Sequence, residues 1–101
     1  MAGLLTRRRA HWRQARIDVG REFVPDTIVA TVGQPLRLVF RRQAGSTSVD
    51  QVVFPALGRS AGLPPGEDVP FELVPAEEGE FEFSCRDGLL RGRLLVTRSA
   101  S

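Results

Sequence analysis

The feature that most constrains the fold of this chain is an alternation of apolar and polar residues in short segments. It is clearest in Glu80-Phe81-Glu82-Phe83, and it recurs in a second segment over residues 93–96. Alternation with a period of two residues is typical of a β-strand that points one face into a core. The loop between the two segments begins with Cys85 and ends at Gly92. These segments predict a pair of strands with a single thiol where the first strand ends.

Similar patterns, bounded by glycine and proline, predict earlier strands over residues 17–19, 27–32, 35–42, 49–54 and 68–74. Residues 20–25 interrupt the strand pattern, and Phe23 is expected to fold back from this segment onto the core. The connection over residues 56–66 is long for a hairpin, so it is expected to cross from one sheet to the other. Without any helical period, this pattern predicts an all-β Greek-key two-sheet β-sandwich of about seven strands. The expected inward-facing residues are Ile17, Val19, Ile28, Leu36, Leu38, Phe40, Val53, Phe71, Leu73, Phe81, Phe83, Leu94 and Val96.

Length and hydropathy indicate one domain. A chain of 101 residues is long enough for a single core. We expect a basic, flexible leader over residues 1–14, the sandwich over residues 15–98 and a short tail over residues 99–101. No apolar run approaches the roughly 18 residues of a transmembrane span, and no apolar stretch follows the first arginines as in a signal peptide. The chain as written is therefore expected to be cytoplasmic.

The net charge of +2 conceals an asymmetry, because five arginines precede the first predicted strand while acids outnumber bases in the remainder. A basic arm of this kind can touch nucleic acid, an anionic lipid surface or an acidic partner. Trp12 is the one aromatic residue among these arginines, so a solvated leader explains them better than a binding surface does. We therefore expect no specific nucleic-acid binding, and an anionic surface remains the alternative contact for the leader.

One cysteine and one histidine limit the metal chemistry. A lone Cys85 forms no intrachain disulfide. A blue-copper site needs two imidazoles beside a thiolate, and the sole imidazole, His11, lies in the leader. Ser48, Asp50, Cys85 and Asp87 are expected to gather at one pole of the sandwich, where they form a weak candidate site for copper or for a divalent ion such as Zn(II). Two alternatives are a metal-free thiol at a strand end, and an oxidant-sensitive thiolate favoured by Arg86.

The residues of this hairpin and of the middle of the chain resemble a known family. A strand that ends in Cys85, then Gly88 and an Arg91-Gly92 pair before a short apolar run, resembles the last hairpin of the copper-binding cupredoxin-like domain family. Residues 50–55, followed by Leu57-Gly58 and residues 63–66, resemble the middle of that family. The resemblance extends from about residue 17 to residue 96 and implies a cupredoxin-like sandwich.

The resemblance also implies where copper ligands would lie. The family has a Cys in the loop before the segment Val52-Val53-Phe54-Pro55, a second Cys at the strand end, and Met residues in the following loop. By position these fall on Ser48, Cys85, Asp87 and Leu89. Thiolate and thioether ligands favour Cu(I), and Cys85 alone supplies sulfur here. The resemblance therefore predicts copper-binding or electron-transfer ancestry with a degenerate metal site.

We expect a non-enzymatic binding module with at most weak metal binding through Cys85. The alternative is a functional Cu(I) carrier or electron-transfer protein whose ligands are completed by a partner chain or a neighbouring domain. Members of the family are often exported or membrane-tethered, so the resemblance and the cytoplasmic expectation differ. No enzymatic constellation stands out, because the adjacent acids Glu77 and Glu78 have no nucleophile or base beside them.

Overall fold

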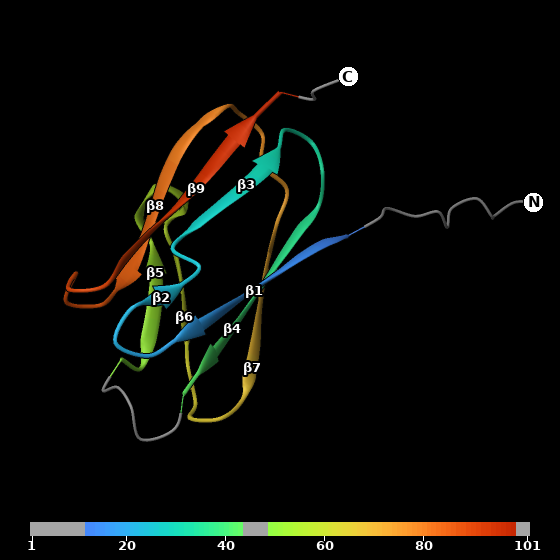
Figure 1. The fold of residues 1–101 in the computed structure, drawn as a ribbon. Helices are drawn as coiled ribbons and strands as arrows, with labels where there is room; N and C mark the ends of the chain where they lie inside the picture. The colour runs from blue at the N-terminus through green and yellow to red at the C-terminus, as the bar shows by residue number, and fades with distance from the viewer. Residues whose placement is uncertain (1–11, 44–48, 99–101) are drawn as a thin grey trace, which may run out of the picture.

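The protein is a sandwich of two β-sheets, as predicted. The computed structural model describes residues 12–43 and 49–98, and Figure 1 shows their arrangement. One sheet has the order β2-β1-β4-β7 and the other has the order β3-β9-β8-β5-β6. The elements are β1 (Arg13–Val19), β2 (Phe23–Val24), β3 (Thr27–Thr31), β4 (Leu36–Arg42), β5 (Gln51–Phe54), the 3-10 helix η1 (Pro55–Leu57), β6 (Arg59–Gly62), β7 (Asp68–Leu73), β8 (Gly79–Cys85) and β9 (Arg91–Thr97).

The core is formed by the inward-facing residues of both sheets. Leu36, Leu38 and Phe40 alternate along β4 and are almost fully buried. They face the apolar residues of β8 and β9, which alternate in the same way. The predicted inward positions are buried throughout β1, β3, β4 and β9. Phe23 is buried as expected.

Phe83 lies at the centre of this core. Its ring lies 5.0 Å from that of Phe23, 5.2 Å from that of Phe54 and 5.7 Å from that of Phe40, measured between centroids. Gly92 faces Phe83 across the β8–β9 ladder, and a Cβ atom at Gly92 would overlap the Phe83 ring. The glycine therefore gives the ring the space that it occupies.

Three predicted core residues differ from expectation. In β5 the buried residues are Val52 and Phe54, so Val53 was wrongly assigned to the inner face. The register explains this, since Val52 pairs with Cys85, a buried residue of β8. Phe81 and Leu73 point toward the core but are only partly buried, because they lie near one end of the sandwich.

The connection after β5 also differs from the prediction. Residues 59–62 form β6, which pairs antiparallel with β5 around the turn of η1. Gly58 ends this turn with a positive φ of 64°, a conformation that favours glycine. The expected crossing between sheets occurs later, between β6 and β7. With β2 and β6, the described residues contain nine strands instead of about seven.

The first strand begins earlier than predicted. Arg13 and Gln14 belong to β1, where they pair with Leu36 and Arg37 of β4, so the expected boundary at residue 15 falls within the strand. Residues 1–11, 44–48 and 99–101 lie outside the described part of the chain. They include most of the predicted leader, the tail, and two residues discussed above, His11 and Ser48.

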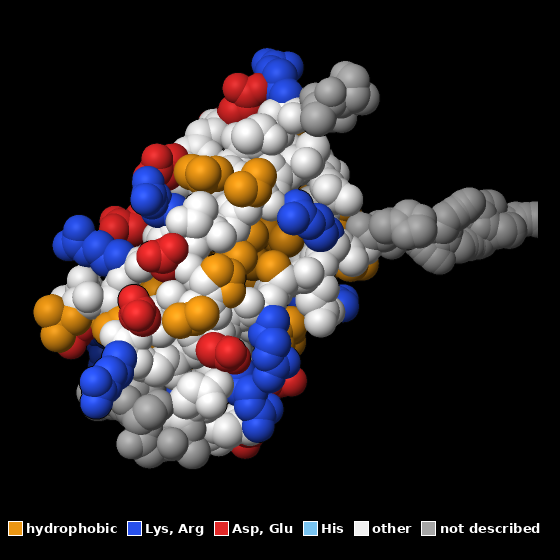
Figure 2. Space-filling model, viewed as in Figure 1, with side chains coloured by type: hydrophobic (Ala, Val, Ile, Leu, Met, Phe, Trp, Pro, Cys, Tyr) orange, Lys and Arg blue, Asp and Glu red, His pale blue; other side chains and the backbone are white. Residues whose placement is uncertain are grey.

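Charged side chains of both signs are interspersed on the outer surface. Figure 2 shows them over the face formed by β3, β8 and β9. On this face Arg93 pairs with Glu80 at 3.3 Å and Arg91 with Glu82 at 3.6 Å. In the part of the chain that the structure describes, no helix has the length and apolar character needed to span a membrane.

Candidate metal centre

Cys85 lies at the last position of β8, where the strand enters the loop to β9. Its side chain is buried, and its backbone is held in register opposite Val52 of β5. The alternation that buries Phe83 also turns Cys85 inward, because the two residues are two positions apart in one strand. We call Val49, Asp50 and residues 85–90 the Cys85 pole.

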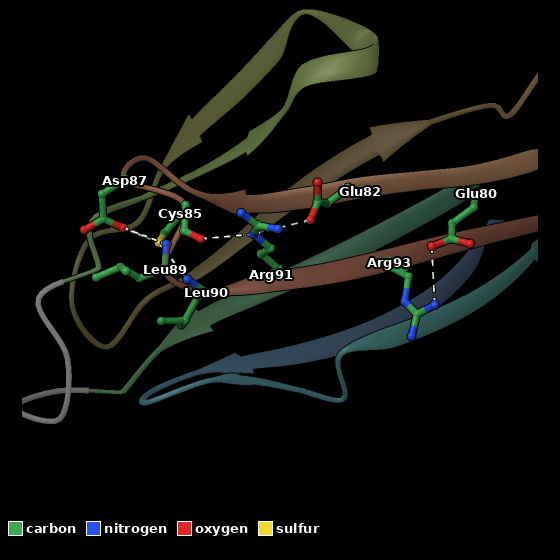
Figure 3. Close-up of polar contacts among 9 residues, drawn as sticks. Glu80, Glu82, Cys85, Asp87, Leu89, Leu90, Arg91 and Arg93 are labelled. Carbon is green, nitrogen blue, oxygen red and sulfur yellow. Dashed lines mark hydrogen bonds and ion pairs between the residues drawn. The ribbon is translucent and has the colours of Figure 1, made fainter.

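The thiol of Cys85 has two hydrogen-bonding partners, which Figure 3 shows. The Sγ–H group donates to Oδ1 of Asp87 at 2.8 Å. The backbone N–H of Leu90 donates to Sγ at 3.2 Å. The first contact requires a protonated thiol, and the second supplies a dipole directed at the sulfur. Both polar directions of the sulfur are therefore occupied by groups of its own loop.

The loop after Cys85 is a compact turn stabilised by backbone hydrogen bonds. Gly88 donates its N–H to the Cys85 carbonyl at 3.0 Å, and Cys85 donates its own to the Leu90 carbonyl at 3.1 Å. Gly88 has a φ of 79°, so a residue with a Cβ would be strained there. The Nε of Arg91 donates to the Gly88 carbonyl at 3.2 Å. These bonds place the Asp87 carboxylate beside the sulfur.

Asp87 is stabilised in its ionised form. The hydrogen bond from Cys85 is the main cause that lowers the pKa of this carboxyl below its usual value, and a second bond from the Leu89 N–H adds to it. Partial desolvation acts in the opposite direction but is weaker. At neutral pH the group beside the thiol is therefore a carboxylate.

Asp50, another predicted ligand, is paired with an arginine. Both of its oxygens lie 3.2 Å from Nη2 of Arg86. Asp50, Cys85, Arg86 and Asp87 line one small pocket of about 120 Å³ together with Val49. The structure thus brings three of the four predicted site residues together, and the fourth, Ser48, lies outside the described residues. Arg86, expected beside the thiol, has Asp50 as its ion-pair partner.

The described donor atoms at the Cys85 pole do not include the two imidazoles that a blue-copper site places beside a thiolate. Within residues 12–43 and 49–98 there is no imidazole, and no group of three or more His, Cys, Asp or Glu residues is placed to hold a metal ion. The donors are one thiol and two carboxylates, a mixture of soft and hard ligands in which Cu(I) would find a single sulfur.

A match to a protein-family model decides the family. The model of the cupredoxin-like domain matches residues 3–96, nearly the whole chain. The chain belongs to the cupredoxin-like domain family. The resemblance noted in the sequence is thereby confirmed, as is the all-β fold class. No curated protein sequence matches the chain.

Solved structures of copper proteins share the fold of this cupredoxin-like domain. A copper-binding protein in its apo form is 34% identical, with a TM-score of 0.80 over 89% of this chain and 92% of that chain. The metal-binding domain of the Cu(I)-exporting P-type ATPase CopA of Streptococcus pneumoniae, solved with Cu(I), is 24% identical, with a TM-score of 0.81 over 86% of this chain and 87% of that one. Auracyanin A, a blue copper protein of Chloroflexus aurantiacus, is 15% identical, with a TM-score of 0.66 over 86% of this chain and all of that one.

Sequence reasoning missed two features of the Cys85 pole. The Leu90 N–H that donates to the sulfur was not anticipated, because a backbone donor leaves no signal in residue type. The exposure of Leu89 was not anticipated either: the family resemblance implies a methionine ligand at this position, and the residue is 81% exposed. Figure 3 shows Leu89 and Leu90 in the loop that carries Asp87.

Proposed function

We propose that this cupredoxin-like domain is a non-enzymatic binding module with a degenerate metal site, which binds copper at most weakly and through Cys85. The observation that carries the proposal is the pair of hydrogen bonds on the Cys85 sulfur. Asp87 and Leu90 occupy the hydrogen-bonding directions of the sulfur through which a thiolate would bind a metal ion. A metal ion would have to displace the proton that bridges the Cys85 sulfur and the carboxylate.

The chemistry of the donors supports weak binding. Cu(I) prefers thiolate and thioether sulfur, whereas carboxylate oxygen is a hard ligand. Cys85 is the one cysteine of the chain, and the sole other sulfur belongs to Met1. Asp50 is also occupied by its ion pair with Arg86. A soft ion at this pole would therefore gain one strong bond and break existing contacts.

A Cu(I) titration tests the proposal. Reduced protein competes for Cu(I) with a chromophoric chelator under anaerobic conditions, and the absorbance of the chelator reports how much Cu(I) the protein takes up. We expect weak competition by the wild type, none by Cys85→Ser and no intense blue colour with Cu(II). The double variant Ser48→Cys with Asp87→Met should compete much more strongly, because it returns soft ligands to the two positions implied by the resemblance. Ser60→Cys, which adds an exposed thiol on β6, is the control for non-specific thiol binding.

The alternative is a working Cu(I) carrier completed by a partner chain. It is favoured by the 34% identity to a copper-binding protein and by the fold shared with a Cu(I)-bound domain. In that case the wild type should bind Cu(I) tightly, and Cu(I) should convert it to a dimer in size-exclusion chromatography. Tight binding that Cys85→Ser abolishes would replace our proposal with this one. If the double variant gains no affinity, the positional correspondence of Ser48 or Asp87 is wrong.

A further inference from the structure

An apolar pocket opens between the two sheets at the end of the sandwich away from Cys85. It has a volume of about 250 Å³. Its floor is made of core residues, Leu94 and Val96 of β9, and Phe81 of β8 forms part of the wall. Phe81 precedes Cys85 by four residues in β8, which separates their Cα atoms by about 13 Å at the usual rise of a strand. The apolar pocket is therefore distinct from the Cys85 pole.

The pocket exists because the edge strands on this side do not close the core. β6 and β7 are the edge strands of different sheets, and the first residue of β6, Arg59, is the part of that strand that lines the pocket. Two large apolar side chains at the pocket are left in contact with water, since Leu57 is 40% exposed and Val74 is 54% exposed. An apolar ligand in the pocket would cover both of them.

Arg59 places a positive charge at this apolar pocket. The Cζ atom of its guanidinium lies 4.2 Å from the centroid of the Phe71 ring, and Nη1 donates to the Glu72 carbonyl at 2.8 Å. Among the described residues, no carboxylate lies within ion-pair distance of Arg59. A guanidinium has five N–H donors, and the hydrogen bond to Glu72 occupies one direction. The remaining donors suit an anion.

Glu77 is the other charged residue that lines the pocket, and it is exposed on the turn before β8. Its carboxylate would oppose an anionic ligand and attract a cationic one. The two charges therefore predict opposite ligand preferences. Arg59 is fixed by the Phe71 ring and the Glu72 carbonyl, whereas no described hydrogen bond or ion pair holds Glu77. A positioned donor selects a ligand more strongly than a solvated charge.

We propose that this pocket binds a small carboxylic acid with a single-ring or short branched hydrocarbon body, its carboxylate on Arg59 and its apolar body against Phe81, Leu73 and Leu94. The size agrees with such a ligand. A cavity of about 150 Å³ accommodates benzene, so 250 Å³ holds one ring with a short chain. Drug-sized ligands occupy pockets of about 300–1,000 Å³ and would not be enclosed. This inference is independent of metal binding at the Cys85 pole.

A series of ligands with one body and three head groups tests the proposal. Phenylpropionate, phenylpropanol and phenylpropylammonium are titrated into the full-length chain, and amide NMR shifts report both the affinity and the location. We expect phenylpropionate to bind about tenfold more tightly than the alcohol, as for a charge-assisted hydrogen bond. The ammonium ligand should be the weakest. Shifts should concentrate at residues 73–81 and 94–96.

Variants assign the preference to particular charges. Arg59→Gln should reduce phenylpropionate affinity about tenfold and leave phenylpropanol unchanged, and Glu77→Gln should strengthen phenylpropionate binding. Arg91→Gln, at the other end of β9, is the matched control. Since Arg59→Gln could disturb the edge strands, salt dependence of wild-type binding gives a second readout: added salt should weaken binding of the acid and leave binding of the neutral alcohol unchanged. Tightest binding of the ammonium ligand, shifts centred on Cys85, or no shifts at millimolar phenylpropionate would overturn the proposal.

Discussion

Gly92 shows how one missing side chain organises the core. Because a Cβ atom at this position would overlap the Phe83 ring, Gly92→Ala must displace the ring or separate β8 from β9. We expect a loss of about 1–3 kcal/mol in the free energy of unfolding, as for other overpacked sites. Urea denaturation measures it. Gly62→Ala is the control, since nothing lies within 4 Å of its Cβ position, and an equal loss in both variants would contradict the steric explanation.

The two phenylalanines of β8 should differ in their contribution to stability. Phe83 is fully buried, whereas Phe81 is partly exposed at the apolar pocket. We expect Phe83→Ala to cost about 3–5 kcal/mol and Phe81→Ala clearly less. The alternation in sequence predicts the same cost for both residues, since it gives their orientation and not their distance from the end of the sandwich. Equal losses in chemical denaturation would show that the pocket closes around Phe81 in solution.

At the scale of single residues, the sequence predicted orientation well wherever one apolar register stood alone. β1 is such a case, with Ile17 and Val19 on one face and the charged Asp18 on the other. It failed in β5, where Val52 and Val53 are both apolar and either could point inward. The pairing of Val52 with Cys85 decides between them, and that contact lies far away in the sequence.

At the scale of elements, one carboxylate connects three strands of a sheet. Asp68 of β7 accepts hydrogen bonds from Arg41 of β4 at 3.1 Å and from Arg16 of β1 at 3.3 Å. The bond from Arg41 is the leading cause that lowers the pKa of this carboxyl, and the charge of Arg16 adds to it. Asp68 therefore binds a proton less readily in the folded state than in the unfolded state.

The sign of this pKa shift predicts acid sensitivity. The contribution of Asp68 is fully present above its unfolded pKa of about 3.9 and is lost as the pH falls through the lower folded value. Asp68→Asn should therefore show a smaller loss of stability than the wild type between about pH 6 and pH 3. We expect a small difference in the melting temperature, because the pairs are exposed. Arg16→Gln with Arg41→Gln should show the same smaller loss, because it removes the two donors that lower the pKa of Asp68.

The β5–β6 hairpin shows why some elements could not be predicted. Its second strand, Arg59-Ser60-Ala61-Gly62, has no apolar alternation and becomes a strand only by pairing with β5. The Cys85 loop was easier to locate, since Cys85 and Gly88 mark its turn. Its chemistry was not, because the contact between Asp87 and the sulfur depends on the backbone bonds of that turn.

At the scale of the whole molecule, the position where the domain begins can be tested by shortening the chain. The Trp12 ring packs against Arg37, whose guanidinium Cζ lies 5.3 Å from the ring centroid. In addition, Nη1 of Arg13 donates to the Val29 carbonyl of the other sheet at 2.7 Å. A chain that starts at Trp12 should therefore melt like the full-length protein. A chain that starts at Ala15 should melt at least about 4 °C lower, as expected for a loss of about 1 kcal/mol in a domain of this size.

A double variant of the full-length chain serves as the control for this truncation. Trp12→Ala with Arg13→Ala removes the same side-chain contacts and should reproduce most of the decrease in melting temperature. A large decrease for the chain that starts at Trp12 would show that residues 1–11 contribute to stability, contrary to the expectation of a solvated leader.

The parallel pairing of β3 with β9 has a consequence for how the domain forms during synthesis. β3 is an edge strand, and its partner in the sheet, β9, is the last strand of the described residues. At about 5–20 residues per second, a ribosome finishes β9 roughly 3–13 s after β3. Small β-rich domains fold within about milliseconds to seconds. Synthesis of β9, and not the folding reaction itself, therefore sets when the second sheet closes, and until then β3 stays open to chaperones or to neighbouring nascent chains.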